Sequence, residues 1–169
     1  MRLRFPESEI KRVAQRYEVP EAEIKLIELK AEVQRCGYVT KDQLRRVAHW
    51  KAARSARHVE KNDDDYVREI TSWALKARSE RARIEILTVL DGVGWPTASA
   101  ILHLFHERRY PILDFRALWS VGLEVPNQYS FLFWQPYVEF CREVARRHHV
   151  NMRTLDRALW QYSKENQGG

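Results

Sequence analysis

The chain has 169 residues, of which 44% are hydrophobic and 31% charged, and its formal net charge is +6. The length predicts one domain over residues 1–169, and the composition excludes a disordered protein. No apolar run approaches the ~18 residues of a membrane span, and the N-terminal residues lack the apolar core of a signal peptide. We therefore expect a soluble, cytoplasmic protein. Cys36 and Cys141 are too few for a structural zinc or an iron–sulfur cluster, which need about four ligands.

Apolar residues recur at helical spacing along most of the chain, while the alternation typical of strands is scarce. This pattern predicts an all-α fold with helices near 7–17, 20–35, 41–57, 63–78, 80–89, 96–107, 114–121, 130–148 and 151–165. Thr40, followed three residues later by Gln43, predicts a capping box at the third helix. Asp63, Asp64 and Asp65 suit the start of the fourth helix, where carboxylates oppose the helix dipole.

Positive charge is concentrated in residues 35–83, which hold 13 Lys and Arg against 7 Asp and Glu. Such a sector indicates a polyanionic partner such as nucleic acid, although a solvated helical surface has the same composition. The most basic helix contains Trp50, Lys51, Arg54 and Arg57. We treat the three cations as candidate nucleic-acid contacts and Trp50 as a candidate for stacking on a base.

Two pairs of histidines could have a special role, one pair because of its spacing and the other because it lies at the end of a predicted helix. His103 and His106 share a helical face, but no third ligand is evident, so we do not expect a metal there. His148 and His149 end a long predicted helix, where protonated imidazole opposes the dipole. We interpret them as capping residues.

The most informative stretch is Leu87–Gly122, which reads LTVLDGVGWPTASAILHLFHERRYPILDFRALWSVG. Gly92 and Gly94 lie between two helical patterns and let the backbone turn sharply and approach a ligand closely. Pro96 suits the first turn of the following helix, because its missing N–H has no intrahelical partner there. A glycine turn that opens a helix presents N–H groups to an anion. Asp114 follows an extended segment and begins another helix.

This stretch resembles the helix-hairpin-helix DNA glycosylases, the group that includes endonuclease III and the adenine-mismatch glycosylases. Their hairpin reads roughly L-P-G-V-G-x-x-T-A, and residues 90–98 of this chain read LDGVGWPTA. Their catalytic aspartate follows a P-I-x-V/L pattern, which residues 111–114 match as PILD. The position that holds a lysine in the lyase members is Pro96 here. The match covers about 36 residues, and the helical pattern on both sides is compatible with the same compact glycosylase-like fold.

The resemblance implies a set of contacts with double-stranded DNA. The hairpin amides near Gly92, Val93 and Gly94 would hold a phosphate, and the carbonyls beneath it would hold a K⁺ or Na⁺ ion. The alternative is that the hairpin is an ordinary turn between helices. The implied DNA-binding positions are Gly92, Val93, Gly94, Trp95, Thr97 and Arg116, and the carbonyls are those of Thr88, Leu90 and Val93.

The same resemblance implies that Asp114 is the catalytic carboxylate, which would stabilise an oxocarbenium-like sugar or orient the attacking water. Alternatively, Asp114 only caps the helix that follows, and both roles are compatible. Pro96 has no amine for a Schiff base, so no lyase activity is expected. The C-terminal part of the chain holds only Cys141 in place of the cysteine loop of the iron–sulfur members, so no iron–sulfur cluster is expected. Arg116 either binds phosphate or neutralises Asp114.

The expected protein is therefore a monomeric, monofunctional DNA glycosylase with DNA as its partner, associated with the nucleoid and active in base excision repair or in defence against modified phage DNA. The identity of the excised base is left open. A second hypothesis is a catalytically degenerate DNA-binding protein that keeps the hairpin. A third is an unrelated helical interaction protein in which the hairpin is only a turn.

Overall fold

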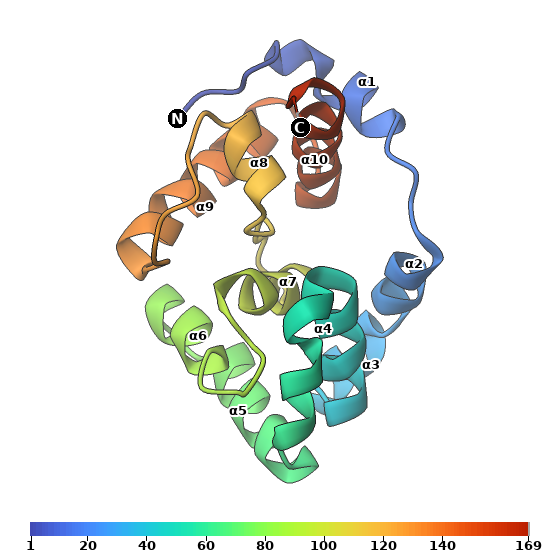
Figure 1. Cartoon of the computed structure of the whole chain (residues 1–169), viewed down its shortest axis with the longest axis vertical. Helices are drawn as coiled ribbons and strands as arrows, with labels where there is room; N and C mark the ends of the chain where they lie inside the picture. Colours follow the sequence, from blue (N-terminus) through green and yellow to red (C-terminus); the bar gives the residue numbers. More distant parts are fainter. Residues whose placement is uncertain (169) are drawn as a thin grey trace. The chain divides into compact units, whose positions relative to one another are not determined.

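The computed structural model describes residues 1–168 and confirms the all-α prediction, since no strand occurs in this range. Figure 1 shows the helices in chain order. Two short 3₁₀ helices are η1 (Glu7–Glu9) and η2 (Arg57–Lys61). The α-helices are α1 (Ile10–Gln15), α2 (Glu21–Glu28), α3 (Lys30–Cys36), α4 (Lys41–Ala56), α5 (Asp64–Lys76), α6 (Glu80–Leu87), α7 (Trp95–Phe105), α8 (Phe115–Ser120), α9 (Phe131–Arg147) and α10 (Met152–Asn166). Within residues 1–168, no helix combines the length and the hydropathy that a membrane crossing requires.

The chain packs as two units, where the length argument predicted one domain of 1–169. Unit 1 combines Met1–Glu18 with the residues from Arg109 onward, and unit 2 is Val19–Arg108. By sequence count, unit 2 holds 16 Lys and Arg against 14 Asp and Glu, so most of the net charge belongs to unit 1. The two elements of the glycosylase-like segment separate accordingly: the hairpin belongs to unit 2 and Asp114 to unit 1.

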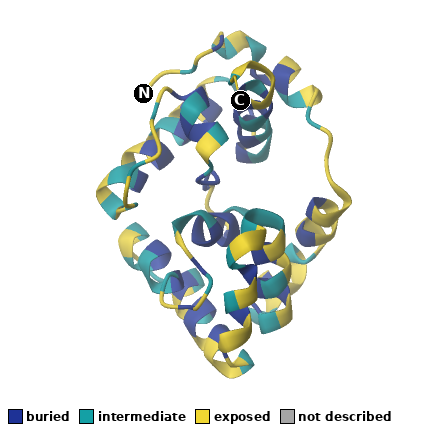
Figure 2. Ribbon diagram, in the orientation of Figure 1, coloured by how far each residue is buried: buried dark blue, intermediate teal, exposed yellow. Residues whose placement is uncertain are grey.

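Unit 2 is built around α7, which contacts α3, α4 and α6. Eight of the residues of this helix are buried, and its polar side chains are those of Thr97, Ser99 and His103. Figure 2 shows much of its ribbon in the dark colour of buried residues. Burial of such a helix on several sides stabilises the unit by the transfer of apolar surface out of water. The hairpin that precedes α7 is therefore attached to the most buried element of the unit.

Unit 1 packs α8, α9 and α1 against α10. Its largest buried side chains include Trp134, Tyr110 and Tyr137. The N-terminal segment is tied to the end of α8, because the Arg4 amide donates to the Ser120 carbonyl at 2.8 Å. This packing surrounds the extended segment that leads to Asp114.

The predicted helix positions are confirmed within a few residues, with two breaks that differ from expectation. The predicted helix 20–35 is two helices, α2 and α3, which are separated at Leu29. The predicted helix 41–57 is kinked at Ala52, whose backbone angles are non-helical (φ −150°, ψ 64°). The predicted capping box of Thr40 and Gln43 is confirmed at the start of α4.

Candidate functional site

The two glycines of the hairpin have different structural roles. Gly92 has φ +79°, which is a left-handed conformation, and a Cβ there would lie 2.8 Å from the Val59 backbone nitrogen and 3.1 Å from the Ser55 carbonyl oxygen. Only glycine satisfies both the dihedral angle and this close approach. Gly94 is exposed, and a Cβ there would meet only Pro96 Cδ, at 3.7 Å. Gly92 therefore fixes the hairpin against η2, whereas Gly94 faces open space.

Asn62 stabilises the hairpin from outside and was not predicted from the sequence. Its side chain is 3% exposed, its Nδ2 donates to the Asp91 carbonyl at 2.9 Å, and its Oδ1 accepts from the Asp91 amide at 2.9 Å. The amide side chain thus pairs with the hairpin backbone as a neighbouring strand would. Nδ2 also donates to the Val59 carbonyl at 2.9 Å, so Asn62 joins η2 to the hairpin. The only signal in the sequence was an Asn before the acidic start of α5.

The hairpin residues 92–94 differ in whether they are available to a ligand. The Val93 amide donates to the Leu90 carbonyl at 3.1 Å, so this amide, which the resemblance assigned to phosphate, is already used inside the turn. Val93 is 4% exposed and anchors the turn in the core. Gly94 precedes α7 as its N-cap, and no side chain caps that end of the helix. Gly94 is the most exposed of the three residues and lies at a helix start, so it is the best candidate of the three for an anion contact.

Other predicted hairpin contacts have limited access to solvent. Thr97 is 1% exposed, so almost none of its surface is open to a ligand in this structure. Trp95 is half-buried at the first position of α7, and Pro96 lies in the first turn, as its chemistry predicted. The Leu90 carbonyl can still offer a second lone pair to a K⁺ or Na⁺ ion. That ion stays a prediction, and no step below depends on it.

The basic sector of residues 35–83 is partly neutralised within unit 2. Arg45 forms an ion pair with Glu60, which holds the pKa of Glu60 below its usual range, and Lys41 lies 3.6 Å from the same carboxylate. Arg68 and Arg81 form ion pairs with acids one helical turn away, and Arg83 is buried and donates to the Ala77 carbonyl. Paired surface cations are poor candidates for phosphate contacts.

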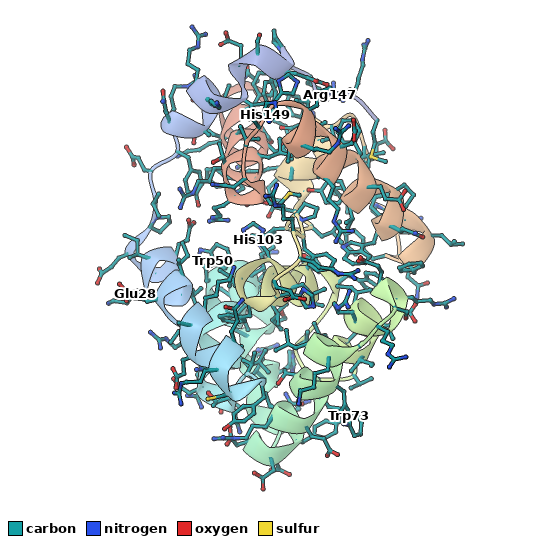
Figure 3. The ribbon with its side chains drawn as sticks, turned by 180° about the vertical axis from the view of Figure 1, so that it is seen from behind. Glu28, Trp50, Trp73, His103, Arg147 and His149 are labelled. Atoms are coloured by element: carbon teal, nitrogen blue, oxygen red, sulfur yellow. The ribbon has the colours of Figure 1, made fainter. Side chains whose placement is uncertain are left out.

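Arg54 and Arg57 stay exposed on the segment that supports the hairpin. They flank Ser55, whose carbonyl oxygen lies close to Gly92, and Val59 lies two residues beyond Arg57. The kink at Ala52 separates them from Trp50 and Lys51, which are half-buried on the first part of α4. Figure 3 labels Trp50. The four predicted contacts therefore do not share one regular helix face. The two arginines are the ones that the structure associates with the hairpin.

Asp114 is held at the N-cap of α8, where its Oδ1 accepts the Arg116 amide at 2.9 Å. The preceding segment is tied on both sides: the Tyr137 hydroxyl donates to the Ile112 carbonyl at 2.9 Å, and the Ile112 amide donates to Asp156 Oδ1 at 3.2 Å. The capping alternative is therefore confirmed. It fixes the direction of the half-buried carboxyl group and leaves the catalytic role as a separate question.

Arg116 does not neutralise Asp114. Its guanidinium lies over the rings of Phe115 and Trp160, 5.0 and 5.3 Å from their centroids, and no ion pair joins it to Asp114 in the described part of the chain. A second neighbour of Asp114 was not predicted. Burial, together with the nearby charge of Asp114, raises the pKa of Tyr129.

The histidines are explained by local contacts. His106 is buried, and its Nδ1 accepts the Arg108 amide at 2.9 Å, while burial and then the charge of Arg83 lower its pKa. Around His103, as elsewhere in residues 1–168, no group of three or more His, Cys, Asp and Glu could hold a metal ion. His148 is the C-cap residue of α9 through its backbone amide, which donates to the Arg146 and Val144 carbonyls, while its Nε2 lies 2.5 Å from a Glu7 oxygen. The predicted effect of imidazole charge on the helix dipole stays a prediction.

Comparison of the chain with protein-family models, with curated proteins and with solved structures gave no match.

Proposed function

We propose that this protein binds double-stranded DNA through the hairpin and acts as a monofunctional DNA glycosylase through Asp114. The observation that carries the proposal is the arrangement at Gly92 and Gly94. Gly92 is packed against the Val59 backbone, and the exposed Gly94 opens the buried helix α7. A rigid turn with an exposed amide at a helix start is suited to a backbone phosphate.

The supporting charge comes from Arg54 and Arg57 on the segment that the hairpin contacts. Guanidinium groups form strong charge-assisted hydrogen bonds with phosphate oxygens. Such contacts release counterions, so binding weakens steeply with added salt. These contacts would position the protein on DNA without reading its sequence.

The reaction assigned to Asp114 is hydrolysis of the bond between a base and its sugar, after the base has left the DNA stack. As the C1′–N bond breaks, its electron pair leaves with the base, and the carboxylate stabilises positive charge on the sugar. A water oxygen bonds to C1′, and the water gives up one proton by way of the carboxylate to solvent. The departing base takes up one proton from solvent, so the products are the protonated free base and an abasic sugar. Pro96 offers no amine in place of water.

A second candidate function is DNA binding without catalysis. The hydrogen bond from the Arg116 amide to Asp114 is a sufficient structural reason for an aspartate at this position. This function would use the same hairpin and the same exposed arginines. The two candidates differ only in whether Asp114 is needed for product formation.

Base release from DNA separates these candidates. Wild type and Asp114→Asn are incubated with duplexes that carry uracil, hypoxanthine, 8-oxoguanine, alkylated purines, mismatches or modified cytosines, and abasic sites are then cleaved with alkali. Asn is as good an N-cap as Asp, so the variant should stay folded and bind DNA. The matched control is Asp63→Asn at the N-cap of α5, where the aspartate makes no capping bond. We expect product with wild type and the control and none with Asp114→Asn, whereas equal activity in all three would remove Asp114 from the mechanism.

A further inference from the structure

A pocket in unit 1 is lined by several basic and polar side chains. Its volume is about 500 Å³, and it lies between α1, the turn after α9 and the start of α10. Figure 3 labels His149 in that turn. Among the described residues that line the pocket, none is an Asp or a Glu. The polar lining includes Lys11, Gln15, Tyr17, His149, Thr154 and Arg157.

Two of its basic side chains, Lys11 and His149, are exposed and take no part in ion pairs within the described chain. Three acids of the surrounding elements have other partners, and Glu18, which follows Tyr17, is exposed and does not line the pocket. Glu9 lies 2.6 Å from Arg12, Glu7 pairs with Arg147 at 3.0 Å and with His148, and Glu165 pairs with Arg16 at 2.7 Å. The positive charge that faces the pocket is therefore not neutralised from its walls.

A further basic side chain of the pocket, Arg157, is placed by aromatic packing. Its guanidinium lies 5.7 Å from the centroid of the Tyr17 ring, and Tyr17 meets Trp160 edge to face at 5.3 Å. A cation over an aromatic face is attracted by the ring quadrupole. The stack holds the planar group at the pocket wall before any ligand enters, which reduces the entropy lost on binding.

The start of α10 adds neutral donors to this wall. Asn151 caps the helix, and its Oδ1 accepts the Thr154 amide at 2.7 Å. Thr154 supplies a hydroxyl in the first turn of a helix of 15 residues, whose positive end favours an anion. Three basic groups and a hydroxyl thus surround one space that no carboxylate lines.

We infer that this pocket binds a phosphate group, carried either by a DNA strand or by a small free phosphate. Planar guanidinium, ammonium and hydroxyl donors match the charge and the several acceptor oxygens of a phosphate. If a DNA strand carries the phosphate group, the inference rests on the proposed function, whereas binding of a free phosphate does not depend on it. In that case the pocket would add a backbone contact in unit 1 to the one at the hairpin.

The first experiment titrates inorganic phosphate into the full chain at constant ionic strength, followed by backbone amide NMR. We expect saturable shifts centred on Val150, Asn151 and Thr154. Lys11→Gln and His149→Asn should each weaken binding roughly tenfold. Asn suits position 149 because it tolerates the left-handed conformation found there (φ +50°). The matched control is Lys164→Gln, an exposed lysine of unit 1 outside the pocket, which should bind phosphate like wild type.

The second experiment measures affinity for duplex DNA with the same variants. If a strand supplies the phosphate, Lys11→Gln weakens DNA binding and lowers the slope of log affinity against log salt by about 1, whereas Lys164→Gln does not. If DNA affinity is unchanged but phosphate binding is lost in the pocket variants, the source is a free phosphate. Unsaturable shifts, or equal phosphate binding by all variants, would overturn the inference. Absence of DNA binding by wild type would instead overturn the proposed function and leave the phosphate result standing.

Discussion

The side chain of Asn62 pairs with the backbone of Asp91 through two hydrogen bonds, each of 2.9 Å, across 29 positions of sequence. The amide group donates to the carbonyl and accepts from the N–H of the same residue. It therefore satisfies both backbone hydrogen-bonding groups of Asp91 in the hairpin. The turn that we propose as a phosphate contact is thus fixed from outside its own helices.

Substitution of Asn62 by alanine is expected to destabilise the protein. The change removes the bonds to the hairpin and to η2 and leaves the Asp91 and Val59 carbonyl groups without this donor, which costs about 1–3 kcal/mol of the free energy of unfolding. Urea unfolding measures this loss. The control is Asn166→Ala, where an exposed amide donates only to the Tyr162 carbonyl of its own helix. Equal stability of the two variants would show that Asn62 does not support the turn.

The two hairpin glycines are expected to respond differently to alanine. Gly92→Ala places a methyl group 2.8 Å from the Val59 nitrogen at φ +79°, so we expect a loss of about 1–3 kcal/mol or a displaced hairpin. At Gly94 a Cβ would meet only Pro96 Cδ at 3.7 Å, so we expect Gly94→Ala to be close to wild type in stability. Thermal unfolding of Gly92→Ala and Gly94→Ala checks it. A melting temperature for Gly92→Ala as high as that of wild type would contradict the close approach to Val59.

Most helix positions could be predicted because burial of one face imposes a helical period on the sequence. The start of a helix could also be predicted where a side chain caps it, as at Thr40 and Asp114. The interruptions of the predicted helices at Leu29 and Ala52 could not be predicted. Neither Leu29 nor Ala52 is a helix breaker, and alanine has the highest helix propensity, so the kink at Ala52 reflects tertiary packing that no local pattern encodes.

The candidate site was predictable only in part, for a similar reason. The hairpin and Asp114 carry short motifs, so their residues could be named in advance. Asn62 and Tyr129 act through contacts with residues distant in sequence and carry no motif. The basic sector showed the amount of charge but not its pairing, because pairing such as that of Arg45 with Glu60 depends on how α4 and η2 are folded.

Because of the ion pair between Arg16 and Glu165, we expect the free energy of unfolding to decrease at acidic pH. Hydrogen bonds from Arg16 and then Gln161 lower the pKa of Glu165 to about 2 in the folded protein. Because the folded pKa lies below the unfolded value near 4.3, the stabilisation is present above about pH 4.3 and is lost as the pH falls toward 2.

Denaturant unfolding of wild type and Glu165→Gln between pH 7 and pH 2 measures this contribution. Wild type should be the more stable of the two at pH 7, and the difference should shrink as the pH falls through the unfolded and then the folded pKa. Glu18→Gln is the control, since it removes an exposed carboxylate for which the structure gives no such pair. A difference that stays constant over this range would show that Glu165 does not hold this charge interaction.

The contact of the hairpin with DNA is the central claim, and both candidate functions depend on it. The most direct measurement is the affinity of wild type, Gly94→Ala and Gly168→Ala for a short duplex at several salt concentrations. A Cβ at Gly94 would project into open space at the start of α7, and Gly168 has nothing within 4 Å, so both variants should fold. We predict that wild type and Gly168→Ala bind with affinity that falls steeply with salt, and that Gly94→Ala binds roughly tenfold more weakly because the methyl group blocks the phosphate. Equal affinity of all three proteins, or binding that does not respond to salt, would contradict the account.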